Sequence, residues 1–178
     1  MRLLAVLAIA GTALLASGCG GDESSSAAWA NDFCSSIDGW REDIEQAAEG
    51  LANPTELNEE NLDEAVQDAV TATDELLQEL GELGPPETEA SQQIQNELND
   101  LEAVLRSRAN NARKALDQPA ESVSDALARL SALAKEFSAA AGAVETAVND
   151  IRELDPAGEL RESLEDSEAC QNLRGQDE

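Results

Sequence analysis

Four long segments of this 178-residue chain repeat apolar residues at alternating steps of four and three positions. An α-helix places residues with this spacing along one side, as in the seam where two long helices pack together. The first segment also carries three of the four aromatic residues of the chain on its stripe. The spacing therefore predicts four long helices, over 27–51, 58–83, 86–116 and 120–154.

The segment 120–154 has the longest stripe, and its many alanines would let a neighbouring helix approach closely. Ser122 followed by Asp125 fits a helix start signal. The stripe predicted to face the interior is Val123, Leu127, Leu130, Ala134, Phe137, Ala141, Val144, Val148 and Ile151.

Proline and glycine separate the segments, because both residues disfavour a continuing helix. A last short segment, 159–173, predicts a fifth helix. Short connections between long helices favour antiparallel neighbours. We therefore expect an all-α fold, an antiparallel up-down four-helix bundle with a short fifth C-terminal helix. The breaks are Asn53-Pro54, Gly84-Pro85-Pro86, Asp117-Gln118-Pro119 and Asp155-Pro156-Ala157-Gly158.

Two cysteines, Cys34 and Cys170, lie near opposite ends of the predicted domain. In a four-helix arrangement the chain returns after its fourth helix to the start of the first. Three or five long helices would instead leave the two cysteines about 40 Å apart. We expect one disulfide between them that closes the bundle. A redox or metal-binding thiol pair is the alternative, but the chain has no Cys-x-x-Cys motif and no histidine.

The N-terminus resembles the signal of bacterial lipoproteins. Met1-Arg2 is a short basic start, the segment 3–15 is apolar, and Ala16-Ser17-Gly18-Cys19 resembles a lipobox. The resemblance, to acidic helical lipoproteins of the high-G+C Gram-positive type, implies cleavage before Cys19 by signal peptidase II. It also implies a diacylglyceryl group and palmitate on the sulfur of Cys19. An ordinary secretory signal with a chance cysteine is the alternative.

This interpretation divides the chain and places it in the cell. It predicts an anchor on the extracytoplasmic face of the cell membrane, with the bundle end that holds Ala27, Gly84 and Leu154 nearest the lipid. The turns 52–57 and 117–120 would form the distal tip. The predicted parts are a signal peptide, 1–18, a flexible tether, 19–26, the bundle domain, 27–174, and a disordered polar tail, 175–178.

The formal net charge of −27 excludes nucleic-acid binding as a main function, because phosphate contacts need a basic surface. Such charge also disfavours self-association, so a homo-oligomer is not indicated. Cationic partners and divalent ions stay open. Glu162, Glu165, Asp166 and Glu168 could gather a divalent cation weakly, but a helical run lacks the shape of a dedicated site. A well-solvated surface or salt adaptation explains the charge equally well.

We find no catalytic constellation, no metal-ligand motif and no cofactor motif, so we expect no enzyme and no cofactor. Two sets of side chains are candidates for binding. The aromatic set could line a ligand pocket, although helical spacing also fits a simple core; the basic set could dock an acidic partner, although ion pairs with neighbouring helices also fit. The aromatic set is Trp29, Phe33 and Trp40, and the basic set is Arg106, Arg108, Arg113 and Lys114.

Two functional hypotheses follow. The first is a non-enzymatic binding or scaffold module for another envelope protein, anchored through Cys19. Exposed apolar residues off the stripes would support it, and Leu77 and Leu133 are the candidates. The alternative is a lipoprotein that binds a small ligand or a divalent cation, with the 29–40 region or the acidic clusters as its site.

Overall fold

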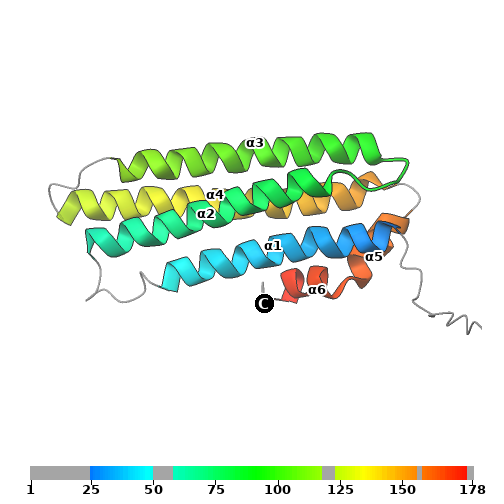
Figure 1. Ribbon diagram of the computed structural model, residues 1–178, viewed down its shortest axis with the longest axis horizontal. Coiled ribbons are helices and arrows are strands. Elements are labelled where there is room, and N and C mark those ends of the chain that lie inside the picture. The colour runs from blue at the N-terminus through cyan, green and yellow to red at the C-terminus, as the bar shows by residue number, and fades with distance from the viewer. Residues whose placement is uncertain (1–24, 50–57, 118–122, 156–157, 176–178) are drawn as a thin grey trace, which may run out of the picture.

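A computed structural model describes residues 25–49, 58–117, 123–155 and 158–175. All regular structure in these ranges is helical. Figure 1 shows four long antiparallel helices with two short ones at the C-terminal end, which confirms the all-α bundle. The helices are α1 Ser25–Glu49, α2 Glu59–Leu83, α3 Ser91–Leu116, α4 Val123–Leu154, α5 Glu159–Asp166 and α6 Glu168–Gly175.

The long helices pack in chain order, α1 on α2, α2 on α3 and α3 on α4, while α5 and α6 pack against α1. The start of α1, the α2–α3 connection and the end of α4 lie at one end of the bundle (Figure 1). This end holds most of the core, including Phe33, Ile37, Leu80 and Ile94, each at most 1 % exposed. The residues that the sequence predicts to be nearest the anchor therefore share one end of the bundle.

The ends of α2 follow from its sequence. The side chain of Asn58 accepts a hydrogen bond from the backbone N–H of Asn61 at 2.9 Å, and acidic residues follow it in the positive first turn. At the other end Gly84 adopts a φ of 62°, which favours glycine, and its N–H donates to the carbonyl of Leu80 at 3.3 Å.

The start predicted for the third helix is wrong, because α3 begins at Ser91 and not at Pro86. The N–H of Thr88 donates to the carbonyl of Pro86 at 2.9 Å, a tight turn that a helix does not contain. Helical bonding begins when the N–H of Ile94 donates to the carbonyl of Ala90 at 3.0 Å. Residues 50–57 and 118–122, with the predicted start signal at Ser122 and most of the distal turns, lie outside the described residues.

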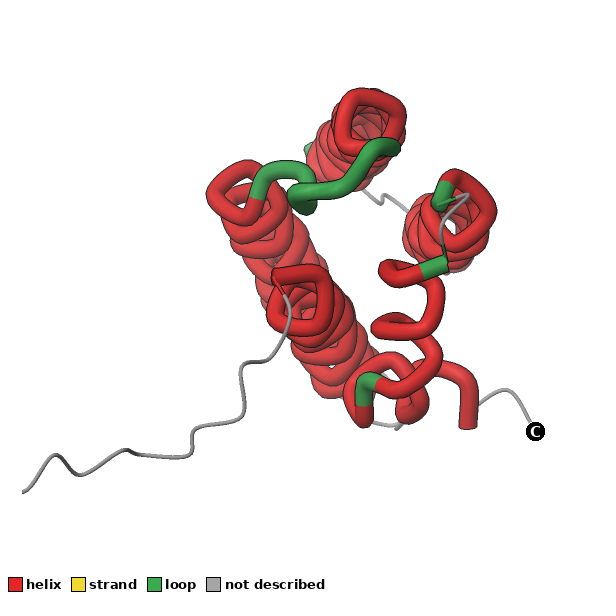
Figure 2. Tube along the Cα trace, turned by 90° about the vertical axis from the view of Figure 1, so that its right-hand side faces the viewer, coloured by secondary structure: helices red, strands yellow, loops and turns green. Residues whose placement is uncertain are grey.

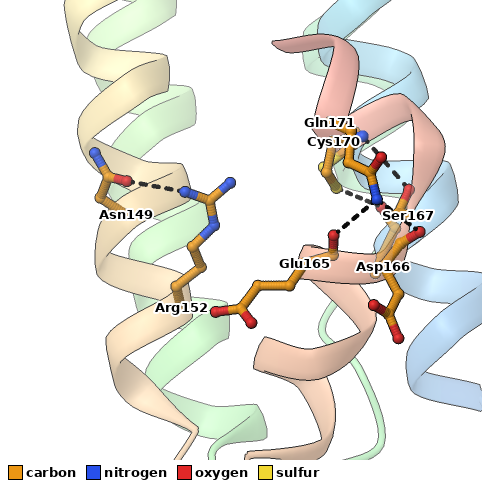
Figure 3. Close-up of a disulfide and its surroundings, with 9 residues drawn as sticks. Asn149, Arg152, Glu165, Asp166, Ser167, Cys170 and Gln171 are labelled. Carbon is orange, nitrogen blue, oxygen red and sulfur yellow. Dashed lines mark hydrogen bonds between the residues drawn. A yellow bond between two sulfur atoms is a disulfide. The ribbon is translucent and has the colours of Figure 1, made fainter. Parts of the chain in front are cut away.

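The predicted fifth helix is two helices, because the chain is extended at Ser167, with φ −61° and ψ 125°. The side-chain amide of Gln171 donates to the carbonyls of Glu165 and Asp166, at 3.1 and 3.4 Å, at the end of α5 (Figure 3). The hydroxyl of Ser167 accepts from the N–H of Cys170 at 3.5 Å. Side chains thus satisfy backbone groups on both sides of the break.

The disulfide between Cys34 and Cys170 is confirmed, and it joins α1 to α6. The two Cα atoms lie 5.1 Å apart, and both side chains are fully buried. Because α6 lies beside α1, the bond closes without crossing the long helices (Figures 1 and 3). It fixes the C-terminal pair of helices on the outside of α1.

The stripe predicted for α4 is only half correct. Leu133 is 2 % exposed, whereas Ala134 and Ala141 are exposed, so one line of the seam lies a residue earlier than predicted. Burying leucine removes more apolar area from water than burying alanine, and two adjacent alanines, 140 and 141, leave the pattern ambiguous. The residues that face the interior are Leu130, Leu133, Phe137, Ala140, Val144, Ala147, Val148 and Ile151.

Removing the disulfide should destabilise the fold strongly, because the bond restricts a loop with a sequence separation of 136 residues. We expect the Cys34→Ala, Cys170→Ala double variant to lose about 3–5 kcal/mol of unfolding free energy. Urea unfolding of wild type and variant, followed by circular dichroism, measures the difference. Equal midpoints would contradict a structural role for the bond.

Candidate functional site

The side of the bundle between α1 and α4 is the most open. The other neighbouring pairs of long helices pack along their lengths, whereas α1 and α4 have little direct contact. Figure 2, which looks along the bundle, shows α5 and α6 beside this side at one end. Further along, the two long helices border a groove of about 520 Å³. Its lining residues are Ile37, Trp40 and Arg41 of α1, and Ser138, Ala141, Gly142, Val144, Glu145, Val148, Asn149 and Arg152 of α4.

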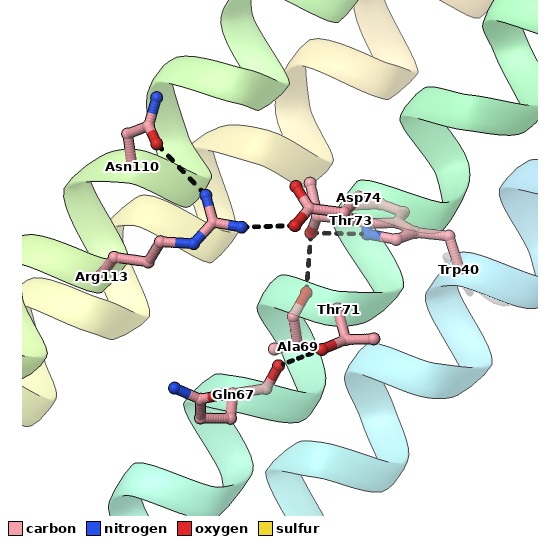
Figure 4. A network of polar contacts seen from close by, with 8 residues as sticks. All are labelled: Trp40, Gln67, Ala69, Thr71, Thr73, Asp74, Asn110 and Arg113. Atoms are coloured by element: carbon pink, nitrogen blue, oxygen red, sulfur yellow. Dashed lines mark hydrogen bonds and ion pairs between the residues drawn. The ribbon is translucent and has the colours of Figure 1, made fainter.

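Trp40 forms the aromatic wall of this α1/α4 groove and is held in place from the other side. Its indole N–H donates to the hydroxyl of Thr73 at 3.2 Å, and that hydroxyl donates to the carbonyl of Ala69 at 2.8 Å (Figure 4). The side chain is only 4 % exposed. Because α2 fixes the orientation of the ring, the groove has a rigid wall before anything binds.

Small residues form the opposite wall. Ser138, Ala141 and Gly142 are exposed on α4. A Cβ atom added at Gly142 would meet no atom within 4 Å, so this part of the wall is open space. A partner backbone can therefore come close to α4 here, and a large side chain at position 142 would fill the groove without straining the helix.

The charged residues that line the α1/α4 groove are Arg41, Arg152 and Glu145, and Glu45 beside Arg41 offsets one of the two positive charges. Arg41 lies 3.6 Å from Glu45, and Arg152 donates to the side-chain oxygen of Asn149 at 3.2 Å (Figure 3). Two adjoining hollows between α1 and α2 are acidic instead, with Asp32, Asp43, Asp68, Glu75 and Glu79 among their lining residues.

The three aromatic candidates have different surroundings. Trp29 and Phe33 stack in the core, with ring centroids 4.9 Å apart, at 6 % and 0 % exposure. The indole N–H of Trp29 donates to the carbonyl of Gly84 at 2.7 Å. Trp40 alone of the three borders the α1/α4 groove. The structure therefore favours the core interpretation for Trp29 and Phe33.

The basic residues of α3 do not form one patch. Arg106 pairs with Glu102 on its own helix at 3.7 Å, Arg108 with Glu136 of α4 at 3.2 Å, and Arg113 with Asp74 of α2 (Figure 4). These partners lie on three different helices. The contacts favour the interpretation as ion pairs, and of the four only Lys114, which is exposed, has no ion pair among those described.

The carboxylate of Glu136 accepts hydrogen bonds from two side chains of α3. Burial raises the pKa of its carboxyl, but hydrogen bonds from Asn111 and Arg108, at 3.3 and 3.2 Å, and the charge of Arg108 bring the pKa below its ordinary value. A carboxyl whose pKa is lower in the folded chain stabilises the fold while it is ionised, and this contribution disappears as the pH falls through the folded-state pKa.

Leu77 and Leu133, predicted as exposed apolar candidates, are both buried, at 9 % and 2 % exposure, so that prediction is wrong. Leu77 completes the α2 face toward the core, and Leu133 packs between α2 and α3. The exposed large apolar residue of the described chain is instead Leu127, at 61 %. Arg129, which the sequence pattern did not single out, is 7 % exposed and pairs with Asp63 and Glu59 of α2.

Among the acidic residues of the C-terminal helices, Glu165 makes a local contact. Glu165 accepts from the guanidinium of Arg161 at 3.1 Å. No group of three or more His, Cys, Asp or Glu side chains in the described ranges is arranged to hold a metal ion. No helix in these ranges is both long and apolar enough to cross a membrane, and Cys19 lies outside them.

No family model, curated protein or solved structure matches this chain.

The Glu136 contacts predict a pH-dependent contribution to stability. Glu136→Gln should lower the unfolding free energy at pH 7 by about 1 kcal/mol, because it removes a charged acceptor from Arg108. As the pH falls, wild type protonates the same carboxyl, so the difference between the two proteins should shrink. Urea unfolding of both proteins, repeated in steps from pH 7 into the acid range, measures this difference in unfolding free energy. A difference that stays constant would contradict the lowered pKa.

Proposed function

We propose that the chain is a membrane-anchored extracytoplasmic lipoprotein that acts as a non-enzymatic binding module for another envelope protein. The contact surface in this proposal is the α1/α4 groove. The observation that carries it is the open α1–α4 side of the bundle, where a rigid aromatic wall faces a wall of small exposed residues. A preformed surface of this kind needs little reorganisation to receive a partner.

The location rests on two features that are independent of the groove. The lipobox-like sequence Ala16-Ser17-Gly18-Cys19 supports lipid attachment after export. The buried Cys34–Cys170 bond supports an oxidising compartment, because disulfides persist in exported chains and are rare in the cytosol. The absence of histidine supports a binding role over acid–base catalysis near neutral pH.

A small ligand is the second candidate occupant. The volume of about 520 Å³ lies within the range of small-molecule sites, and Trp40 supplies an apolar contact. A ligand in the α1/α4 groove would raise the melting temperature of the purified protein. The extended, open form of the groove between two long helices favours a protein partner.

Lipid attachment predicts a specific role for Cys19. Replacing it with serine, Cys19→Ser, should abolish incorporation of labelled palmitate and release the protein from its anchor, because a hydroxyl cannot take the place of the sulfur. Metabolic labelling and cell fractionation measure both effects. The Cys34→Ala, Cys170→Ala variant is the control and should keep its label. A wild-type chain that takes up no label would contradict the anchor.

Protein binding predicts a position-specific capture in cells. A photo-crosslinking residue in place of Ala141, in the groove, should capture the same envelope protein repeatedly, and one in place of Gly81, on the exposed side of α2, should not. Adding Gly142→Leu should abolish the capture, because the leucine occupies the groove. Mass spectrometry identifies the captured protein. An identical profile at both positions, capture of the chain's own copies alone, or no capture would contradict the proposal.

A further inference from the structure

We infer that α5 and α6 form a redox-dependent strap, which the Cys34–Cys170 bond holds on α1 and which reduction of that bond releases while the four long helices stay folded. The strap is the segment Glu159–Gly175. Its release would lengthen the open side of the bundle, because α5 and α6 lie beside the α1–α4 side at one end (Figure 2). This switch goes beyond the proposed binding role and does not depend on the identity of a partner.

The strap contacts the rest of the described chain mainly through α1. Its contacts with α4 are few, and in the described chain neither α5 nor α6 packs along α2 or α3. The contacts of α1 with α2 lie away from the strap (Figure 1). The strap can therefore leave without breaking the contacts that join the long helices in sequence.

The face of α1 under α6 carries small residues. Cys34 is bonded to Cys170, and the Sγ atom of Cys170 lies 3.6 Å from the carbonyl oxygen of Ala30, one turn earlier on α1. Uncovering an alanine and a cysteine exposes little apolar area, so it costs α1 little stability. The indole groups of Trp29 and Trp40 donate hydrogen bonds to α2 and its C-terminal cap, so α1 keeps its other attachments.

Few side chains hold the strap on α1 apart from the bond. In its described part the buried side chains are Leu160, Leu164 and Cys170. Helices of eight residues are not stable in water alone, so α5 and α6 are helical because they are docked. Two leucines offset only part of the entropy that the segment loses when it becomes ordered. The bond is therefore needed, because it restricts the freedom of the undocked segment.

Local opening of α6 would give a reductant access to the bond. In the closed form both cysteines are fully buried, so a thiolate cannot reach their sulfur atoms. Cys170 is the one buried side chain among those described on α6, and exposed bonds from Gln171 hold this helix to the end of α5 (Figure 3). Elements with few buried contacts and exposed hydrogen bonds open locally at low free energy. We therefore expect α6 to open first.

The reductant of this switch is a dithiol, and the reaction is thiol–disulfide exchange. A thiolate of the dithiol attacks the Sγ atom of Cys170, which forms a mixed disulfide and expels the sulfur of Cys34 as a thiolate. The second thiolate of the dithiol then closes a ring within the reductant and expels the sulfur of Cys170. The dithiol loses two electrons and two protons, and the two cysteines gain them as thiols. The reverse reaction with an oxidised dithiol would restore the strap.

Hydrogen exchange of the purified protein, before and after treatment with dithiothreitol, tests the release. After reduction the amides of the strap should exchange at least about tenfold faster, and those of α2 and α3 should change by less than about twofold. Alkylation followed by mass spectrometry shows that Cys34 and Cys170 are reduced. The Cys34→Ala, Cys170→Ala variant is the control: its strap should exchange fast without dithiothreitol and should not change when it is added.

Two matched variants test the opening of α6 as the route to the bond. Gln171→Ala removes the amide that holds the end of α5, so dithiothreitol should reduce the folded protein about fivefold faster. Gln78→Ala removes an exposed side-chain bond to Glu82 within α2 and should leave the reduction rate within about twofold. Melting temperatures of the oxidised variants show that both are folded.

Three results would overturn the inference. Unchanged exchange in the strap after both cysteines are reduced would show that the strap stays docked without the bond. Equal acceleration in α2 and α3 would show that the bond holds the whole fold and not a strap. Equal reduction rates in wild type and Gln171→Ala would show that α6 does not open first. None of these results concerns the capture of a partner through Ala141, so the proposed function is tested separately.

Discussion

The position of α5 and α6 against α1, fixed by the Cys34–Cys170 bond, is the constraint on which the open side of the bundle depends. In a regular four-helix bundle the fourth helix packs back on the first and covers their shared side. Here the C-terminal helices occupy that side at one end and keep α1 and α4 apart. The groove further along is a consequence of this separation. Burial on the three packed sides supplies the hydrophobic stabilisation, so the fourth side is available for binding.

The spacing of apolar residues and the positions of the breaks were enough to predict the all-α class, the four long helices and the disulfide. These predictions were correct because apolar spacing shows where a helix forms and proline shows where it ends, and both effects depend on neighbouring residues in the sequence. The register of α4 could not be predicted, because Leu130 to Ala141 offers two overlapping lines of apolar residues, and the positions of α2 and α3 select between them. The start of α3 at Ser91 depends on a backbone turn at Pro86 that apolar spacing does not encode.

The candidate site was predicted only through Trp40. Its aromatic neighbours at positions 29 and 33 share its helical spacing, but they face the end of the bundle where α5 and α6 complete the core. Sequence spacing places a residue on a face of its own helix, and whether a neighbour covers that face is a tertiary property. The same limit explains Arg129: the sequence does not show that its side chain is covered, whereas in the fold it is buried and its guanidinium pairs with Asp63 and Glu59, two exposed carboxylates of α2.

The bond between α1 and α6 also determines how the molecule would respond to mechanical force. Suppose that the chain is held at its N-terminal end and pulled at the groove. On the α1 side tension would enter at Ser25 and reach Trp40 and Arg41 through about four turns of one continuous helix. The connections from α2 to α4 would lie outside this path. Cys34 lies within it, so the covalent link would share the load with the C-terminal helices and resist their peeling from the bundle.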